Sequence, residues 1–243
     1  MKRSALSIIL LAALSCAAAW AEEPSAHQPQ AGIQRIQAAV QHVLASNAAF
    51  AATHNPSYFE PFAKGQTPPA TVVGCSDSRV HMHAVDQTPD NEVFVIRNIG
   101  NQLATAEGSV EYGVHHLHTP LLLIIGHSGC GAITAAVGDY SKESPAIRRE
   151  LDSLKVKKGG DISAEIIANV NDQVATALQK FAPEVEAGEL AVVGSLYDFR
   201  NDYGQGPGNL IIVNINGETD PAKLVQSPYL AGIENVKLLQ RAH

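Results

Sequence analysis

The clearest helical spacing in the chain lies close to its start. Apolar residues recur there three and four positions apart: Ile33, Ile36, Val40, Val43 and Leu44. This spacing predicts an amphipathic helix. Helical spacing also covers 106–118 and 130–137, and a more charged helical stretch covers 141–182 with a break near Gly159. The segment between Tyr58 and Gln66 lacks such spacing and is predicted to be a loop.

Short apolar runs alternate with these helices. They lie at 70–74, 92–96, 121–126, 190–199 and 210–215. A continuous apolar run is typical of a strand buried on both faces, and strands that alternate with helices form largely parallel sheets. The pattern therefore predicts an α/β fold, with a single domain whose mostly parallel β-sheet is flanked by helices. An N-terminal helical arm precedes it.

The first residues have a different character. Two basic residues follow Met1, residues 4–21 are uncharged, and the run ends in Ala19-Trp20-Ala21 before an acidic pair. This layout predicts a secretory signal peptide over 1–21 and a polar linker over 22–30, which leaves the folded domain over 31–243. The expected location is then the periplasm. The alternatives are an uncleaved membrane anchor, for which the run is short, and an N-terminus lipidated at Cys16.

Charge and cysteine content narrow the function. The 17 basic residues are outnumbered by 24 acidic ones, so a basic groove for nucleic acid is not expected. No later segment is long and apolar enough to span a membrane. Of the three cysteines, Cys16 leaves with the signal peptide, and Cys75 and Cys130 remain. In an oxidising compartment, two cysteines suggest a disulfide by default.

The positions of these cysteines favour a metal site over a disulfide. Cys75 ends the first apolar run, and Cys130 follows the third with His127 three residues before it. The carboxyl ends of parallel strands are where α/β sites form. Two thiolates and an imidazole make a Cys₂His set, which catalytic zinc uses with a fourth position open to water. The sequence therefore predicts one Zn²⁺ per subunit.

Two charged residues next to Cys75 fit the same site. Asp77 can accept a hydrogen bond from a zinc-bound hydroxide and orient it, and Arg79 can keep that carboxylate ionised through a bidentate pair. The alternative is that both residues only cap the turn after the strand. Ordinary capping needs the aspartate and no arginine, which favours the catalytic interpretation.

At these residues the sequence resembles the β-class carbonic anhydrases. The matching segments are Cys75-Ser76-Asp77-Ser78-Arg79-Val80, Arg97-Asn98-Ile99-Gly100-Asn101 and Gly126-His127-Ser128-Gly129-Cys130-Gly131. Ser109-Val110-Glu111-Tyr112 and Gly194-Ser195-Leu196-Tyr197-Asp198 are also similar. The resemblance implies reversible hydration of carbon dioxide to bicarbonate and a proton, with zinc bound by the Cys₂His set and Asp77–Arg79 as the catalytic dyad.

The resemblance also implies residues that line the substrate site. These are Gln66, Phe94, Tyr112 and the backbone N–H of Gly131. It implies self-association as a dimer or tetramer with sites near the subunit interface. In a closed state of the family, the residue corresponding to Asp77 becomes a fourth zinc ligand. Members with an inhibitory bicarbonate pocket carry tryptophan where this chain has Val72, so that inhibition is not expected here.

Some alternatives stay open at the level of sequence. The same zinc set serves relatives that act on carbonyl sulfide or carbon disulfide, and a non-catalytic zinc protein is a third interpretation. His81 and His83 are candidates for proton transfer, although histidines at such positions are more often surface residues. His115, His116 and His118 look like a metal cluster, but adjacent helical positions point in different directions.

Overall fold

The computed structural model describes residues 29–240, with side chains from residue 32 onward. The predicted signal peptide and most of the predicted linker lie outside these residues. The chain divides into two compact units, residues 1–61 and residues 62–243, and each is described by itself.

The N-terminal unit consists of α1 (Pro29–Thr53) and α2 (Pro56–Phe59). The predicted amphipathic helix is confirmed, and it begins two residues inside the predicted linker. Its apolar stripe, which includes Ile36 and Val43, is exposed. The start of the predicted loop at 58–66 is helical instead, because Asn55 caps α2 by accepting a hydrogen bond from the backbone N–H of Ser57.

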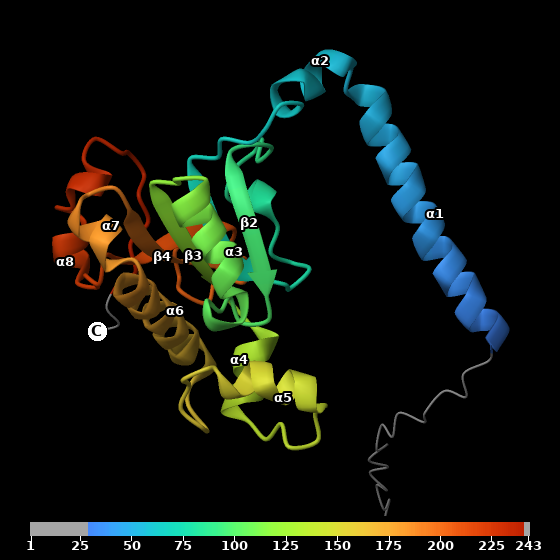
Figure 1. Ribbon diagram of the computed structural model, residues 1–243. Helices are drawn as coiled ribbons and strands as arrows, with labels where there is room; N and C mark the ends of the chain where they lie inside the picture. The colour runs from blue at the N-terminus through green and yellow to red at the C-terminus, as the bar shows by residue number, and fades with distance from the viewer. Residues whose placement is uncertain (1–28, 241–243) are drawn as a thin grey trace, which may run out of the picture. The chain divides into compact units, whose positions relative to one another are not determined.

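The C-terminal unit is built on a five-stranded sheet (Figure 1). The strands are β1 (Ala70–Cys75), β2 (Val93–Asn98), β3 (Leu121–His127), β4 (Ala191–Asp198) and β5 (Asn209–Ile215). Their order is β2-β1-β3-β4-β5; the first four are parallel, and β5 is antiparallel to β4. The predicted mostly parallel sheet is confirmed. All of β1 is buried, as its continuous apolar run predicts.

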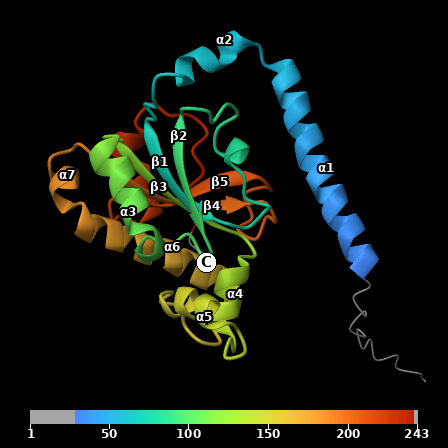
Figure 2. The ribbon, with the colours of Figure 1, turned by 45° about the vertical axis from the view of Figure 1, so that its right-hand side comes forward.

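Helices pack against this sheet or lie at one end of it (Figure 2). They are α3 (Glu107–Glu111), α4 (Gly131–Val137), α5 (Pro145–Asp152), α6 (Ile162–Lys180), α7 (Ala182–Glu186) and α8 (Pro221–Leu224). A π-helical turn, η4 (Tyr112–His116), continues α3. Four short 3₁₀ turns complete the described elements: η1 (Glu60–Phe62), η2 (Met82–Ala84), η3 (Ala104–Ala106) and η5 (Pro228–Leu230).

Helix α6 lies close against β3 and β4 because both strands carry a glycine beneath it. A Cβ atom on Gly126 would lie 2.6 Å from Val170 Cγ2, and one on Gly194 would lie 2.8 Å from Val170 Cγ1. Val170 and Val174 are fully buried at this contact. The two glycines thus set the distance between helix and sheet, and with it the position of the strand ends that follow.

The outer edge of β5 is occupied by the C-terminal segment. The backbone N–H of Ile212 donates to the carbonyl of Lys237 (2.8 Å), and that of Leu239 donates to the carbonyl of Ile212 (3.1 Å). Leu238 is buried there with Ile215 and Leu224. Within the described part of the chain, no helix has the length and apolar character needed to cross a membrane.

Candidate metal centre

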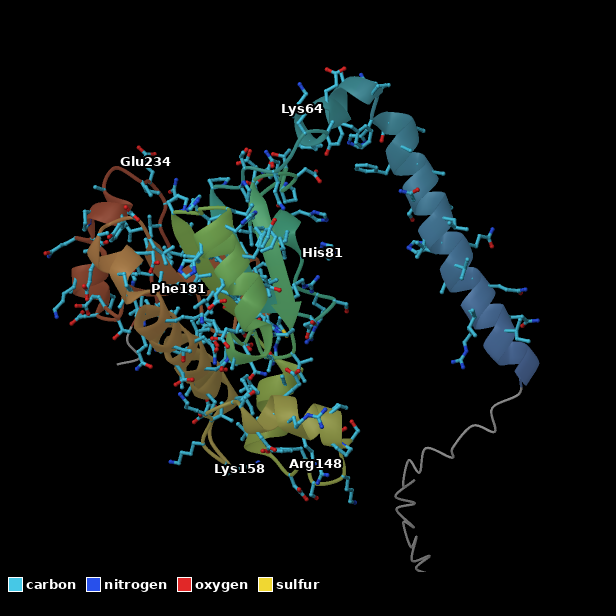
Figure 3. All side chains as sticks on the ribbon, in the orientation of Figure 1. Lys64, His81, Arg148, Lys158, Phe181 and Glu234 are labelled. Carbon is cyan, nitrogen blue, oxygen red and sulfur yellow. The ribbon has the colours of Figure 1, made fainter. Side chains whose placement is uncertain are left out.

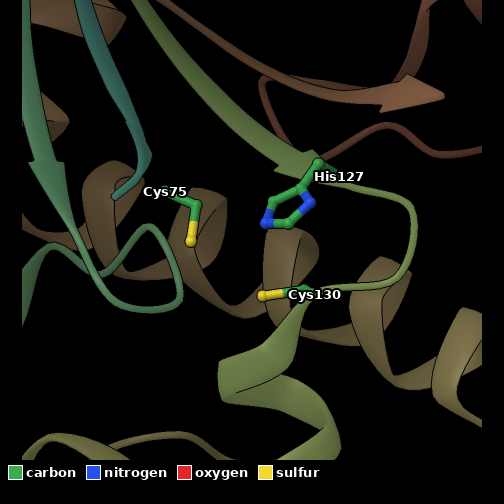
Figure 4. Close-up of side chains that lie close together, drawn as sticks. All are labelled: Cys75, His127 and Cys130. Carbon is green, nitrogen blue, oxygen red and sulfur yellow. The ribbon is translucent and has the colours of Figure 1, made fainter. Parts of the chain in front are cut away.

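Three ligand side chains converge at the carboxyl ends of neighbouring strands. Cys75 is the last residue of β1, His127 is the last residue of β3, and Cys130 is the N-cap of α4. Their sulfur and nitrogen ligand atoms all lie within 4.8 Å of one another, and all three residues are buried. Figure 4 shows the side chains pointing toward a common centre. The sheet therefore brings together the three residues predicted to bind zinc.

The imidazole of His127 is held on one side and lacks a partner on the other. Its Nδ1 lies 3.1 Å from the carbonyl oxygen of Ser128. Its Nε2 is buried with no hydrogen-bond partner in the part of the chain that the structure describes. A buried unpaired nitrogen is costly unless something binds it. Between two thiols, a metal ion of zinc type satisfies it, so the residues present fit zinc.

The two thiols are electrostatically coupled. Both cysteines are free, so the disulfide alternative is not formed. A hydrogen bond from Cys130 lowers the pKa of Cys75 to about 4, against the opposing effect of burial. The same interaction raises the pKa of Cys130. A divalent cation that binds both sulfurs requires both cysteines as thiolates, so metal binding releases protons from this pair.

The predicted dyad is formed beside the ligands. Arg79 donates from Nε to Asp77 Oδ1 (2.9 Å) and from an Nη atom to Asp77 Oδ2 (2.6 Å), and its backbone N–H also reaches Oδ1 (3.0 Å). These bonds hold the pKa of Asp77 well below its usual range, so the carboxylate is ionised at neutral pH. Asp77 Oδ2 lies 3.9 Å from His127 Nε2, which places it at the edge of the ligand set.

Sequence reasoning gave no role to Arg97, although it lies in a matching segment. Its Nε donates to the carbonyl of Cys75 (2.8 Å), and an Nη atom donates to the carbonyls of Asp77 (2.7 Å) and Val80 (2.7 Å). Arg97 therefore fixes the turn that carries both a ligand and the dyad. In the sequence, the feature that could have indicated this role is a charged residue at the end of an apolar run, here the strand β2 that pairs with β1.

The predicted substrate-lining residues fall into two groups. Gly131 follows Cys130 at the start of α4, and a Cβ atom there would meet nothing within 4 Å. Gln66 and Tyr112 line one pocket. The ring of Phe94 lies 5.7 Å from that of Tyr112.

The second group lies at the other end of the sheet from the ligands. Phe94 pairs with Thr71, whereas Asn98 pairs with Cys75. Four residues of strand separate these two positions, which is ~13 Å. Within one chain, the structure brings Gly131 to the metal ligands but not Gln66, Phe94 or Tyr112.

The remaining histidines do not join this centre. His81 (labelled in Figure 3) and His83 are both exposed. Their rings stack with centroids 4.9 Å apart. His115 pairs with Glu184 at 3.0 Å, whereas the ring of His116 lies 4.4 Å from that of Tyr112. These two adjacent histidines thus point in different directions, as the helical spacing predicts. Among residues 32–240, the Cys₂His set is the one group with metal-ligand geometry.

The fold and this ligand set define an α/β protein with a candidate Cys₂His metal site at the carboxyl end of a parallel sheet. A family model described as carbonic anhydrase matches residues 70–205, which is more than half of the chain. The chain belongs to the carbonic anhydrase family, in its β class, and is an enzyme of that family. Carbonic anhydrases hydrate carbon dioxide.

Similar proteins agree with this assignment. "Carbonic anhydrase 2" of Mycobacterium tuberculosis is 30% identical over 151 residues, covering 56% of this chain and 72% of that protein. A carbonic anhydrase of Synechococcus elongatus is 32% identical over 177 residues, covering 61% of this chain and 64% of that protein. A tetrameric β-carbonic anhydrase of Sordaria macrospora shares the fold, with a TM-score of 0.61 and 24% identity over 72% of this chain and 97% of that chain.

Proposed function

We propose that this chain is an exported zinc enzyme that hydrates carbon dioxide reversibly to bicarbonate and a proton. The observation that carries the proposal is the imidazole of His127, a ring nitrogen of which lies within 4.8 Å of two cysteine sulfurs. Its Nε2 is buried, has no hydrogen-bond partner in the described residues and lies 3.9 Å from an ionised aspartate. Cys75, His127 and Cys130 hold one zinc ion per subunit. Bound zinc would supply Lewis acidity, which lowers the pKa of water and provides a nucleophile for carbon dioxide.

Asp77 orients the reacting oxygen. Its Oδ1 is occupied by Arg79 Nε and by a backbone N–H, whereas Oδ2 accepts from Arg79 and faces His127. An ionised carboxylate only accepts hydrogen bonds. An oxygen atom next to Oδ2 therefore has to donate its own O–H to Asp77. This hydrogen bond points the lone pairs of that oxygen away from the carboxylate and toward the carbon atom of carbon dioxide. Arg79 keeps Asp77 ionised and in place.

A second copy of the chain completes the substrate site. Gln66, Phe94 and Tyr112 are predicted to line that site but lie at the far end of the sheet from the ligands of their own chain. Self-association as a dimer or tetramer brings these three residues to the metal centre of a partner. The β-carbonic anhydrase of Sordaria macrospora is tetrameric, which supports assembly of this kind. The exposed apolar stripe of α1 adds a surface for association.

The proposed location is the periplasm. It rests on the signal-peptide pattern of residues 1–21, which implies cleavage after Ala21 and a mature chain that begins in the linker. Sequencing the N-terminus of the protein purified from cells tests it. An intact Met1 in the purified protein would refute export by this route.

Stopped-flow measurement of carbon dioxide hydration tests the activity. We expect the zinc-loaded protein to be active, and Asp77→Asn to lose 10²-fold or more, roughly, with its zinc content unchanged. Asp86→Asn is a matched control, because Asp86 accepts only local bonds from Thr88. Release of sulfide from carbonyl sulfide without hydration would assign the sulfur substrate instead. Bound zinc with neither activity would show that the chain is a non-catalytic zinc protein.

Subunit complementation tests the shared site. Gln66→Ala should impair one half of the site and Cys130→Ser the other half, each in its own homodimer. Refolding the two together forms mixed dimers in which one site has both intact halves. Random pairing then restores about a quarter of the wild-type rate. Recovery no greater than the sum of the two single variants would show that each chain works alone.

A further inference from the structure

The end of β4 reaches the metal centre through a residue that lies outside every matching segment. Phe199 follows Asp198, the last residue of β4, and is partly buried. The guanidinium carbon of Arg79 lies 4.9 Å from the centre of its ring. The ring also stacks on the imidazole of His127, with centroids 6.0 Å apart and planes 23° apart. One aromatic side chain therefore lies beside both a metal ligand and the dyad arginine.

The backbone on either side of Phe199 is tied to the ligand loop. Tyr197 pairs with His127 in the sheet, and its carbonyl accepts a hydrogen bond from the backbone N–H of Ser128 (3.1 Å). The backbone N–H of Arg200 donates to Ser128 Oγ (3.2 Å). Phe199 lies between these two attachments, so the sheet itself fixes where its ring stands relative to the centre.

Arg200 adds a second contact from the same segment. A Cβ atom on Gly129 would lie 2.5 Å from an Nη atom of Arg200, so Gly129 leaves the space that this side chain occupies. Gly129 also has a φ of +63°, which a residue with a side chain rarely adopts. The carbonyl of Gly129 in turn accepts a hydrogen bond from Arg79 (3.1 Å). The loop that supports Arg79 is therefore itself packed against the end of β4.

Arg79 needs support beyond its ion pair. Its side chain is 50% exposed, so water competes for the guanidinium, and exposed ion pairs are weak. Arg97 does not compensate, because its own N–H groups bind the carbonyls of the preceding turn. An aromatic face attracts a cation without using its N–H groups, so Phe199 can hold Arg79 while Asp77 and Gly129 keep their hydrogen bonds.

We propose that Phe199 is a positioning residue of this site, whose ring holds the Arg79 guanidinium in its pair with Asp77 and against the Gly129 carbonyl. Without the ring, Arg79 leaves the pair more often, and Asp77 is then free to turn away from the orientation that the reaction uses. The consequence for turnover rests on the proposed function. The consequence for Arg79 itself does not, because it concerns how often the guanidinium is free.

Chemical modification of arginine measures how often the Arg79 guanidinium is free, independently of turnover. Zinc-loaded full-length protein is treated with phenylglyoxal, and the rate at each arginine is followed by peptide mass spectrometry. In Phe199→Leu we expect Arg79 to react two- to fivefold faster, roughly, the range that an exposed cation–π contact supplies. Phe199→Tyr keeps the aromatic face and should react like the wild type. Arg35, on the exposed face of α1, gives the rate of an unhindered arginine.

Two comparisons exclude a general loosening of the protein. Arg97 should stay slow in every variant, because three carbonyls hold it. Tyr140→Leu removes another cation–π contact, in which Lys158 Nζ lies 3.9 Å from the Tyr140 ring, and should leave Arg79 unchanged. The proposal would be overturned if Arg79 reacted at the same rate in the wild type and in Phe199→Leu. It would also be overturned if Arg97 were accelerated as much as Arg79, or if Arg79 reacted as fast in Phe199→Tyr as in Phe199→Leu.

Kinetics give the second readout. Phe199→Leu should lower kcat by about the same two- to fivefold factor, with KM and zinc content unchanged, and Phe199→Tyr should restore it. If a fall in zinc content accounted for the lost rate, Phe199 would act by supporting the ligand His127 rather than Arg79, and the proposal would be overturned. An inactive wild type would refute the proposed function, while the modification rates would still decide the role of Phe199.

Discussion

The two ends of the sheet differ in how much of their chemistry a single chain completes. At the carboxyl ends of β1 and β3, buried sulfur and nitrogen atoms converge, and Asp77, Arg79 and Arg97 find their partners within the chain. At the amino ends, Gln66 and Tyr112 are exposed beside a pocket that contains no metal ligand. A single chain therefore brings its three candidate metal ligands together, whereas two of the residues predicted to line the substrate site stay exposed at the other end of the sheet.

The largest effect should come from removing a ligand. His127→Ala is expected to reduce bound zinc from one per chain to nearly none. The hydration rate should fall by more than ~100-fold, because losing a residue that only hydrogen-bonds to a metal ligand already costs up to about 100-fold. Atomic absorption and stopped-flow assays measure both. His42→Ala, on exposed α1, is the control and should keep its zinc. A variant without His127 that retains full zinc would remove the distinction between the two ends.

A change near the amino end should instead lower stability and spare the metal. Gly113 packs against β1, and a Cβ atom there would lie 2.1 Å from Thr71 Oγ1. Gly113→Ala should therefore lower the free energy of unfolding by about 2–3 kcal/mol, as overpacking does. Urea unfolding measures this. At Gly108, where a Cβ atom meets nothing within 4 Å, the same substitution should be neutral or stabilising, and an equal loss at both glycines would contradict the packing argument.

Arg97 tests how tightly the carboxyl end is held. Arg97→Met leaves three carbonyls of the turn at 75–80 without their donor, and kcat should fall by about tenfold while the fold persists. Arg97→Lys keeps the charge but not the fork of donors, so it should recover only part of the rate. Full recovery by lysine would show that charge alone matters there. Arg148→Met, on the exposed face of α5, is the control.

The smallest effect concerns a buried hydroxyl pair near the amino end. Thr119 Oγ1 lies 2.8 Å from Thr71 Oγ1 and donates to the carbonyl of Gly113 (3.2 Å). Thr119→Val leaves the buried Thr71 hydroxyl without this partner, while the Gly113 carbonyl keeps its bond from the backbone N–H of residue 119 (3.2 Å). The free energy of unfolding should therefore fall by about 1–2 kcal/mol with zinc content unchanged. Thr88→Val, at an exposed turn, should change it by less than about 0.5 kcal/mol. A loss of zinc in Thr119→Val would mean that the two ends are coupled.

The strands were predictable where burial on both faces made the chain continuously apolar. Runs 70–74 and 121–126 correspond to β1 and β3 almost residue for residue. The second strand is displaced, because Arg97 and Asn98 belong to β2 although they are polar. Their side chains bind the turn after β1 and the loop after β2, which no local pattern reveals. The helical start at Pro56 was readable from Asn55-Pro56, a cap followed by proline at the first helical position.

The candidate site was predictable where a contact depends on a short stretch of sequence. Asp77 and Arg79 are two residues apart, and His127 and Cys130 are three apart, so their types and spacing already suggest the site. Phe199 reaches the same place from β4, more than 60 residues farther along the chain, and only the register of β3 with β4 puts it there. The antiparallel direction of β5 likewise depends on pairing rather than on its own residues.

The different edges of the sheet have a consequence for assembly. The edge at β5 is taken up by Leu238 and its neighbours, whereas β2 is the last strand on the other side of the sheet. The engaged β5 edge therefore leaves the β2 edge as the better place for backbone pairing between copies. Two such edges can only meet each other, across a two-fold axis, and the pair then offers no further edge. Pairing of copies through the β2 edge would thus form a closed pair rather than an open-ended fibre.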